Sequence, residues 1–292
     1  MKIGLTAHPE KSNALALAER VSEIVGDRAE LVLSDEIPGV GRARPHGPLE
    51  SLHPDVLIAI GGDGTFLHAL RRSDAPLLPI NAGTVGVLAE VEARQPKEIE
   101  WAVERLLRGF YFLEERMKLA AQVGHRRLPD AANEYVVHSA AVAKMGLFEI
   151  AFDGRVAGRL RADGLIVASP TGSTGYSLSS RGPIVDSAID ALVLIAIAPF
   201  RTDPRAVVLE GLRTVQLRPL EESPGAIVVV DGDSEHRLSP TAPVVIYRSP
   251  RRAVLVRFGS QMFQRLRGKR ILPWSEEFAE EGPPLADLPP PA

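Results

Sequence analysis

The pattern of apolar residues changes near residue 111 and divides the 292-residue chain into two parts. Before that point, short apolar runs alternate with segments that carry apolar residues at helical spacing. This alternation predicts a parallel sheet with helices on its faces. After it, runs of valine, isoleucine and alanine are broken at short intervals by turn-forming pairs. We therefore expect an α/β N-terminal domain with a parallel sheet and a C-terminal all-β, β-sandwich-like domain.

Individual elements follow from the same patterns. Strands are predicted at residues 3–7, 31–33, 56–60 and 77–80, and helices at residues 12–25, 66–72 and 97–107. Glycines and prolines at residues 38–48 predict a long exposed loop. The pairs Asp153-Gly154 and Asp231-Gly232 predict hairpin turns, because glycine supplies the positive φ that such turns need. Residues 275–292 combine acidic residues and prolines without a basic residue, which predicts a disordered tail.

Composition argues against several classes of protein. A net charge of -3 gives no reason to expect nucleic acid or a membrane surface as a partner, and the basic residues 265–270 are more typical of a helix end than of a nucleic-acid patch. The chain has no cysteine, which excludes disulfides and thiolate metal sites and fits a reducing compartment. Its longest apolar run, residues 191–200, is about half the roughly 20 residues that span a bilayer. We expect a soluble, cytoplasmic protein.

The stretch IGGDGTFLHA follows the apolar run 56–60 and surrounds Asp63 with Gly61, Gly62 and Gly64. Because glycine loses entropy on folding and packs nothing, such a cluster indicates that another atom approaches the backbone. Backbone N–H groups at the start of a helix suit a phosphate. A carboxylate beside a polyphosphate needs magnesium or a reacting proton between them, so Asp63 is predicted to be a general base or a metal partner. The alternative is a tight turn with an N-capping aspartate.

A second stretch, residues 161–180, is rich in hydroxyl-bearing side chains and includes Gly172 and Gly175. Small polar groups on a flexible loop can line a sugar or adenine site, and Tyr176 offers a ring for stacking. The alternative is a polar surface linker. The pair Asn133-Glu134 is by itself more typical of a solvated turn before a strand. His68 is more typical of a packed or exposed helix residue than of a catalyst.

Four stretches occur in the order and approximate spacing seen in a known family: GGDGTFLHA, INAGTVGVLAEV, NEYVV and DGLIVASPTGSTGYSLSSRGPIV. That family is the NAD kinases, which the chain resembles from residue 3 to residue 274. The resemblance implies an α/β domain at 1–112, completed by a returning segment at 258–274, and a β-rich NAD-binding domain at 113–257, with the tail at 275–292. NAD would bind between the domains. The implied reaction is magnesium-dependent phosphoryl transfer from ATP, or from polyphosphate, to the 2'-hydroxyl of the adenosine ribose of NAD.

The resemblance also implies roles for individual residues. Asp63 would be the catalytic base. The NAD-binding residues would be Asp63, Gly64, Asn133, Glu134, Arg161, Asp163, Thr171, Thr174, Gly175 and Tyr176. The donor phosphates would be bound by Gly61, Gly62, Gly64 and Thr65. Mg²⁺, or another divalent cation, would be held mainly by the nucleotide phosphates, because the sequence has no dedicated cluster of carboxylates for a metal. A homodimer or homotetramer is implied.

Some positions depart from the family pattern. Val87 stands where phenylalanine is common, Gly175 where alanine is common, Phe200 in place of a histidine and Asp233 in place of a glutamine. The smaller Val87 predicts a looser adenine site. Two other functions remain as alternatives: a lipid kinase of the diacylglycerol type, which shares the GGDGT turn, and a nucleotide sensor without turnover.

Overall fold

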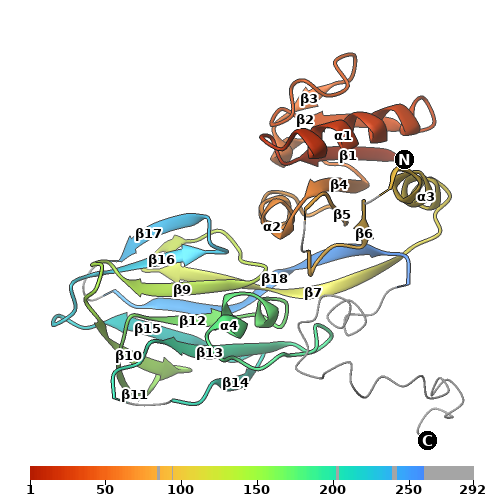
Figure 1. Cartoon of the computed structure of the whole chain (residues 1–292). Helices are drawn as coiled ribbons and strands as arrows, with labels where there is room; N and C mark the ends of the chain where they lie inside the picture. The colour runs from red at the N-terminus through yellow and green to blue at the C-terminus, as the bar shows by residue number, and fades with distance from the viewer. Residues whose placement is uncertain (84–85, 94, 202–203, 239–241, 260–292) are drawn as a thin grey trace, which may run out of the picture.

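A computed structural model describes residues 1–83, 86–93, 95–201, 204–238 and 242–259. Figure 1 shows the two parts expected from the sequence, with three longer helices gathered around the N-terminal strands and a larger β-rich part below them. These helices are α1 (Ser12–Val25), α2 (Asp63–Arg72) and α3 (Pro96–Leu107). A shorter helix, α4 (Tyr176–Ser179), lies in the β-rich part. Within the described residues, no helix is long and apolar enough to cross a membrane.

The N-terminal strands form a parallel sheet in the order β3-β2-β1-β4-β5, with β6 beside β5. Every residue of β4 is buried, as expected for a strand that is covered on both faces. The bounds are β1 (Lys2–Ala7), β2 (Glu30–Ser34), β3 (His46–Gly47), β4 (Val56–Gly61), β5 (Leu77–Asn81) and β6 (Val91–Glu92). The strands and helices predicted for this part are confirmed, although α2 begins three residues before the predicted start.

Two long antiparallel strands connect the two parts of the molecule. They are β7 (Phe112–Val123) and β18 (Val244–Arg257), and Figure 1 shows them running side by side out of the β-rich part beneath the N-terminal sheet. At one end β18 pairs with β15, and at the other it pairs in parallel with β5. A single sheet of twelve strands therefore extends through both parts. Residue 112, the end of the first domain expected from the sequence, is the first residue of β7.

The β-rich part packs two sheets against each other. The six-stranded sheet has the order β14-β13-β12-β9-β16-β17, and its apolar side chains share one core with those of the other sheet, for example Tyr135 and Leu165 with Phe148 and Val215. This arrangement confirms the expected sandwich. The strands of the six-stranded sheet are β9 (Glu134–Ser139), β12 (Gly164–Ala168), β13 (Ala191–Ile197), β14 (Val207–Glu210), β16 (Ala226–Val230) and β17 (Ser234–Leu238). The remaining strands are β8 (Arg126–Arg127), β10 (Gly146–Phe152), β11 (Arg155–Ala162) and β15 (Val215–Pro219).

The loop predicted at residues 38–48 is only partly exposed, so that prediction was wrong in one respect. Val40 is buried in the N-terminal core, and the short strand β3 pairs with β2. A short 3-10 helix at Leu49–Ser51 follows. The apolar side chain of Val40, which the glycines and prolines around it obscured, anchors the segment. Residues 260–274 of the expected returning segment, the basic residues 265–270 and the tail lie outside the described residues.

The predicted hairpin turns are confirmed. Asp153 and Gly154 have φ of 48° and 77° between β10 and β11, and Asp231 and Gly232 have φ of 48° and 71° between β16 and β17. Positive φ at both central residues gives the turn a twist that matches the twist of the flanking strands. The second of these turns reaches the candidate active site.

Candidate active site

Asp63 lies where β4 ends and α2 begins. Gly62 is the N-cap residue and Asp63 the first residue of the helix, so the alternative of an N-capping aspartate is wrong. The Asp63 carboxylate accepts hydrogen bonds from the backbone N–H groups of Val87 at 2.9 Å and Leu88 at 3.2 Å. The side chain is thus fixed between α2 and the loop that follows β5. It lies at the carboxyl edge of the parallel sheet, where ligands of open α/β sheets bind.

The three glycines around Asp63 have different roles. A Cβ on Gly61 would lie 2.3 Å from the hydroxyl oxygen of Thr65, so this glycine makes room for a neighbour in the same chain. A Cβ on Gly62 or Gly64 would meet no atom within 4 Å. None of the three has a positive φ. These positions therefore require glycine because it lacks a side chain, and not because the backbone angles are unusual. At Gly62 and Gly64 the backbone is open to a ligand.

A cavity of about 480 Å³ lies beside this turn, between α2 and the tip of the β16–β17 hairpin. An ion pair between Arg71 of α2 and Asp233 of the hairpin bridges it. His68, a residue of α2, also lines the cavity, and its Nε2 contacts Glu36 at 2.7 Å. The lining residues are Ala7, His8, Pro9, Glu36, Gly64, Thr65, His68, Arg71, Asp231, Gly232 and Asp233.

The tip of the same hairpin also holds the segment that contains Asn133 and Glu134. The buried carboxylate of Asp231 accepts the backbone N–H groups of Ala132 at 2.9 Å, Asn133 at 2.8 Å and Glu134 at 3.0 Å. Three N–H donors on one carboxylate fix the path of this segment. Asn133 and Glu134 are therefore held by the hairpin, and Glu134 is buried, so the pair is not the solvated turn that it alone suggested.

Two acceptor atoms of this segment are buried without a hydrogen-bond partner among the described residues: Oδ1 of Asn133 and Oε2 of Glu134. Leaving such an atom without a ligand or water to bond it costs about 1–3 kcal/mol. Burial, together with the nearby charge of Asp231, raises the pKa of Glu134 to about 8. Burial also raises the pKa of Asp231, but its three N–H donors oppose that shift. The three N–H donors favour the charged form of Asp231, whereas the high pKa of Glu134 favours its protonated form at neutral pH.

The hydroxyl-rich stretch is ordered and not the flexible loop that we expected. It forms a 3-10 helix at Gly172–Thr174 followed by α4. The buried hydroxyls of Ser169 and Ser173 donate to the carbonyls of Ala132 and Pro170. These two serines therefore hold the backbone together and are not available to a ligand.

The glycines of this stretch allow it to approach Asn133 and Glu134. A Cβ on Gly172 would lie 2.2 Å from the carbonyl oxygen of Asn133, and a Cβ on Gly175 would lie 3.3 Å from both Nδ2 of Asn133 and Oε2 of Glu134. Thr171, next to Gly172, is buried. Thr174 donates its hydroxyl to the carbonyl of Thr171 at 3.1 Å. The structure thus brings the second and third predicted motifs together.

Three of the predicted NAD-binding residues, Arg161, Asp163 and Tyr176, lie away from both the α2 turn and this cluster. Arg161 and Asp163 precede β12, whereas Glu134 pairs with Ala168 at the other end of that strand. At about 3.3 Å per residue, these ends are roughly 13 Å apart. Tyr176 is 42% exposed and lines a different hollow of about 540 Å³ beside Arg181 and Arg205.

The sequence patterns did not reveal two residues of the cavity wall. They indicated Asp231 only as part of a turn, and Arg71 only as part of a helix. Neither role is visible locally, because each depends on a partner that is distant in sequence. The signal that could have been used is the aspartate of the Asp-Gly turn, since a buried turn carboxylate needs donors.

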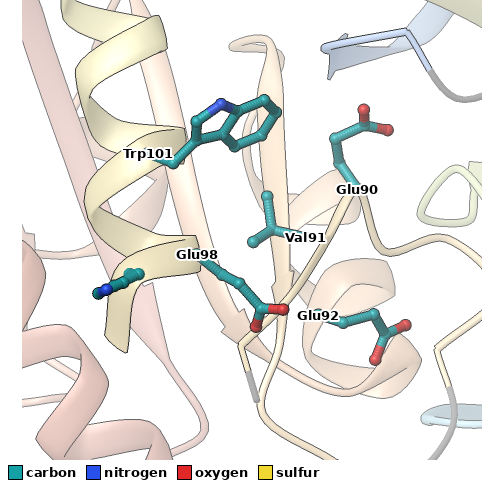
Figure 2. A pocket seen from close by; sticks show the side chains of 6 residues that line it. Glu90, Val91, Glu92, Glu98 and Trp101 are labelled. Atoms are coloured by element: carbon teal, nitrogen blue, oxygen red, sulfur yellow. The ribbon is translucent and has the colours of Figure 1, made fainter. Parts of the chain in front are cut away.

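A further cavity of about 420 Å³ lies beside α3. Figure 2 shows its lining by Glu90, Val91, Glu92, Glu98 and Trp101. It contains none of the predicted site residues. We assign no ligand to it.

The start of α2 is open to an anion, and Asp231 in the wall of the same cavity holds the segment that carries the unsatisfied acceptors. Both features suit a nucleotide. The class that this architecture defines is the two-domain, nucleotide-dependent phosphotransferases. Comparison with known proteins identifies the family. Residues 3–111 match the model of the ATP-NAD kinase N-terminal domain, and residues 132–258 match that of the ATP-NAD kinase C-terminal domain.

Whole-chain relatives agree. The NAD kinase of Methanothermobacter thermautotrophicus is 36% identical over 281 residues, which cover 93% of this chain and 96% of the relative. That of Thermococcus gammatolerans is 38% identical over 273 residues, covering 91% and 97%. The crystal structure of an NAD kinase from Archaeoglobus fulgidus in complex with ATP superposes with a TM-score of 0.75 at 28% identity, covering 92% of this chain and 98% of that one. The chain belongs to the NAD kinase family, and the resemblance drawn from its motifs is confirmed.

A yeast NADH kinase complexed with NADH shares the fold, with a TM-score of 0.82 at 20% identity, covering 94% of this chain and 89% of that one. The matching family models and relatives make this chain a phosphotransferase of the NAD kinase type. They give no support to the lipid kinase alternative.

Proposed function

We propose that this NAD kinase binds NAD against the wall formed by Asn133, Glu134, Gly172 and Gly175, and transfers a phosphoryl group to the adenosine 2'-hydroxyl beside Asp63. The observation that carries this proposal is the pair of unsatisfied acceptors on Asn133 and Glu134. Ribose hydroxyls and the adenine amino group are donors, so they complement these atoms. NAD as a substrate agrees with the names of the relatives.

For the phosphoryl donor, we propose the cavity beside α2. The open backbone of Gly62 and Gly64 and the start of α2 would receive the phosphates, with Gly61 allowing the close packing of Thr65. The cavity, with a volume of about 480 Å³, accommodates part of a nucleotide. ATP is favoured over polyphosphate by the ATP bound to the Archaeoglobus fulgidus kinase.

A magnesium ion fits this assignment as a companion of the donor. Among the described residues there is no cluster of three or more acidic or histidine side chains that could hold a metal. Phosphate oxygens would therefore supply most of its ligands, and the carboxylates of Glu36 and Asp233 in the cavity wall offer the oxygen atoms that Mg²⁺ prefers. When bound, the ion would neutralise charge on the transferred group.

Asp63 is proposed as the general base. Because its two oxygens are fixed by the N–H groups of Val87 and Leu88, its orientation is set before substrate binds. In this role it accepts the proton of the 2'-hydroxyl, and such catalysis contributes about 10²- to 10⁴-fold in rate. The other residues of the site position the two substrates, which is the main requirement of phosphoryl transfer.

The test is NADP formation by the Asp63→Asn variant, with magnesium and either ATP or polyphosphate as donor. We expect kcat to fall about 10²- to 10⁴-fold while the KM for NAD changes little, because the base acts only in the transition state. Asp153→Asn is the control, since Asp153 also accepts a backbone N–H, that of Thr214, in a turn remote from the cavity. Unchanged turnover in Asp63→Asn would exclude the base assignment, and NADP formation by the wild type excludes a sensor without turnover.

We also propose self-association to a homodimer or homotetramer, and a cytoplasmic location. Support for association comes from the edge strand β14, on which Val207 and Val208 are exposed. The cysteine-free composition suits a reducing compartment. Light scattering during size-exclusion chromatography, with Val208→Lys as a variant, tests the association: a wild type that elutes as a monomer contradicts it.

A further inference from the structure

A buried ionic cluster lies behind the loop that contacts Asp63. At its centre is Arg257, the last residue of β18, which is completely buried. Removing a guanidinium from water costs several kcal/mol, and ion pairs in such places often fail to stabilise the fold. The presence of this arginine therefore calls for a reason other than stability.

The contacts of Arg257 point in two directions. Its Nε donates to Glu114 at 2.5 Å, and its Nη1 donates to Glu90 at 3.1 Å. Figure 2 shows the Glu90 carboxylate turned away from those of Glu92 and Glu98, and its second oxygen accepts the N–H of Phe258 at 2.7 Å. Nη1 also donates to the carbonyl oxygen of Leu88 at 3.0 Å.

Leu88 is consequently held on both sides. Its carbonyl accepts from Arg257, while its N–H donates to Asp63 at 3.2 Å and the adjacent N–H of Val87 donates to the other carboxylate oxygen. Its side chain is buried in a core that also contains Phe66 of α2. One residue thus separates the buried guanidinium from the carboxylate beside which the reaction is proposed to occur.

We propose that Arg257 is a positioning residue for phosphoryl transfer: by fixing the carbonyl of Leu88, it holds the Val87 and Leu88 N–H groups where they orient Asp63. This inference rests on the proposed role of Asp63. The planar guanidinium suits the task, because its several donors have fixed directions and can join Glu114, Glu90 and the loop at once. Misplacing a reacting group by about 1 Å can cost about 10²-fold in rate, so a small shift of the loop is enough to matter.

Arg116 provides a matched control. It is also buried, at 3% exposure, and it donates to the same carboxylate, Glu114, at 3.0 and 3.2 Å. Burial alone would raise the pKa of Glu114, but the charges of Arg116 and Arg257 and their hydrogen bonds lower it to about 2. Both arginines thus serve the charge balance of the cluster, but the hydrogen bond to Leu88 is made by Arg257.

The first experiment compares Arg257→Gln, Arg257→Lys and Arg116→Gln for thermal unfolding, kcat and KM. We expect Arg257→Gln to lower kcat about 10- to 100-fold with little change in the KM for NAD. Arg257→Lys, which keeps the charge but has no fork of donors, should retain an intermediate kcat. Arg116→Gln should lose comparable thermal stability while its kcat stays within about twofold of the wild type. Equal losses of kcat in Arg116→Gln and Arg257→Gln, or a loss of stability alone, would overturn the proposal.

The second experiment is a double-mutant cycle with Asp63→Asn and Arg257→Lys, a variant chosen because it preserves the buried charge. If Arg257 acts through Asp63, adding Arg257→Lys to Asp63→Asn leaves the residual turnover unchanged. A multiplicative loss in the double variant would overturn the positioning role while leaving the base assignment intact. Wild-type turnover in Asp63→Asn alone would instead reject the base assignment, so the two failures are distinguishable.

Discussion

At the scale of single residues, neighbouring glycines in the same turn answer different physical demands. Gly61 faces the Thr65 side chain, whereas Gly64 faces open space. The first is required by packing within the chain and the second is available to a ligand. The sequence alone shows the three glycines as equivalent, because it shows neither what a Cβ would meet nor the sign of φ.

This difference gives a prediction. Gly61→Ala places a methyl group against Thr65 and should lower the free energy of unfolding by about 1–3 kcal/mol. Gly64→Ala, at an exposed position in the first turn of α2, should raise it by about 0.5–1 kcal/mol because alanine is the better helix former, yet should raise the KM for ATP. Denaturant unfolding and steady-state kinetics of both variants measure these effects. A Gly64→Ala enzyme with an unchanged KM for ATP would argue against phosphate binding at that backbone.

A second prediction concerns Glu134 and the dependence of the free energy of unfolding on pH. Its pKa in the folded chain is raised to about 8 from 4.5, so folding retains a proton that the unfolded chain releases. Its effect on stability is favourable below pH 4.5 and is lost as the pH rises towards 8, at up to about 1.4 kcal/mol per pH unit. Glu134→Gln should remove this decline and make the ligand-free protein more stable than the wild type at pH 8 and above.

Denaturant unfolding of ligand-free protein between pH 5 and pH 9 is the measurement, at roughly unit intervals. Glu10→Gln, at an exposed position, is the control and should follow the wild type. If the wild type and Glu134→Gln lose stability in parallel over this range, the proton is not on Glu134.

At the scale of elements, the β16–β17 hairpin contacts α2 through one ion pair. Arg71 is nearly buried, with 7% of its side chain exposed, while Asp233 is 63% exposed. Solvent around Asp233 therefore screens the attraction between the two charges and makes it weak. Leaving the buried Arg71 guanidinium without a hydrogen-bond acceptor costs more free energy than losing that attraction. The substitution that removes the acceptor should matter more than the one that removes only the charge.

Asp233→Ala should accordingly lower the free energy of unfolding by about 1–2 kcal/mol and raise the KM for ATP, since the cavity wall loses a contact across the cleft. Asp233→Gln keeps an acceptor and should stay within about 0.5 kcal/mol of the wild type. Thermal unfolding and donor kinetics of the two variants decide this. If Asp233→Ala matches the wild type in both measurements, the pair has no part in closing the cavity.

Most helices and strands could be predicted from the local sequence pattern. The predictions that differ from the structure do so for physical reasons. The sequence pattern places the start of α2 three residues too late because glycine is a poor helix former, although Gly64 lies in the first turn of the helix. The sequence pattern predicts a flexible loop after β12 because Gly172 and Gly175 lie among small polar residues, whereas the hydroxyls of Ser169 and Ser173 bond to nearby carbonyls. Motif order led to Asn133, Glu134 and Asp63. Arg71 and Arg257 act through partners that are distant in sequence and leave no local signal, and Asp231 is marked only by its Asp-Gly turn.

At the scale of the molecule, β7 and β18 run through both parts, and one sheet includes strands of each. The parts should therefore unfold together, in a single calorimetric transition whose calorimetric and van't Hoff enthalpies have a ratio of about 1. Differential scanning calorimetry at several scan rates is the measurement. Two resolved transitions would show that the shared strands do not couple the parts.

The pairing of β7 with β18 is interrupted once, between Arg248 and Arg252. Within the interruption, Ser249 and Arg251 both bind the buried carboxylate of Asp130, at 2.6 and 3.0 Å. The ribbon formed by β7 and β18 thus has one irregularity, and the carboxylate of Asp130 fixes it in place. Any change in the relative orientation of the two parts must therefore twist or bend this ribbon as well as break the contacts that α2 makes with the β-rich part.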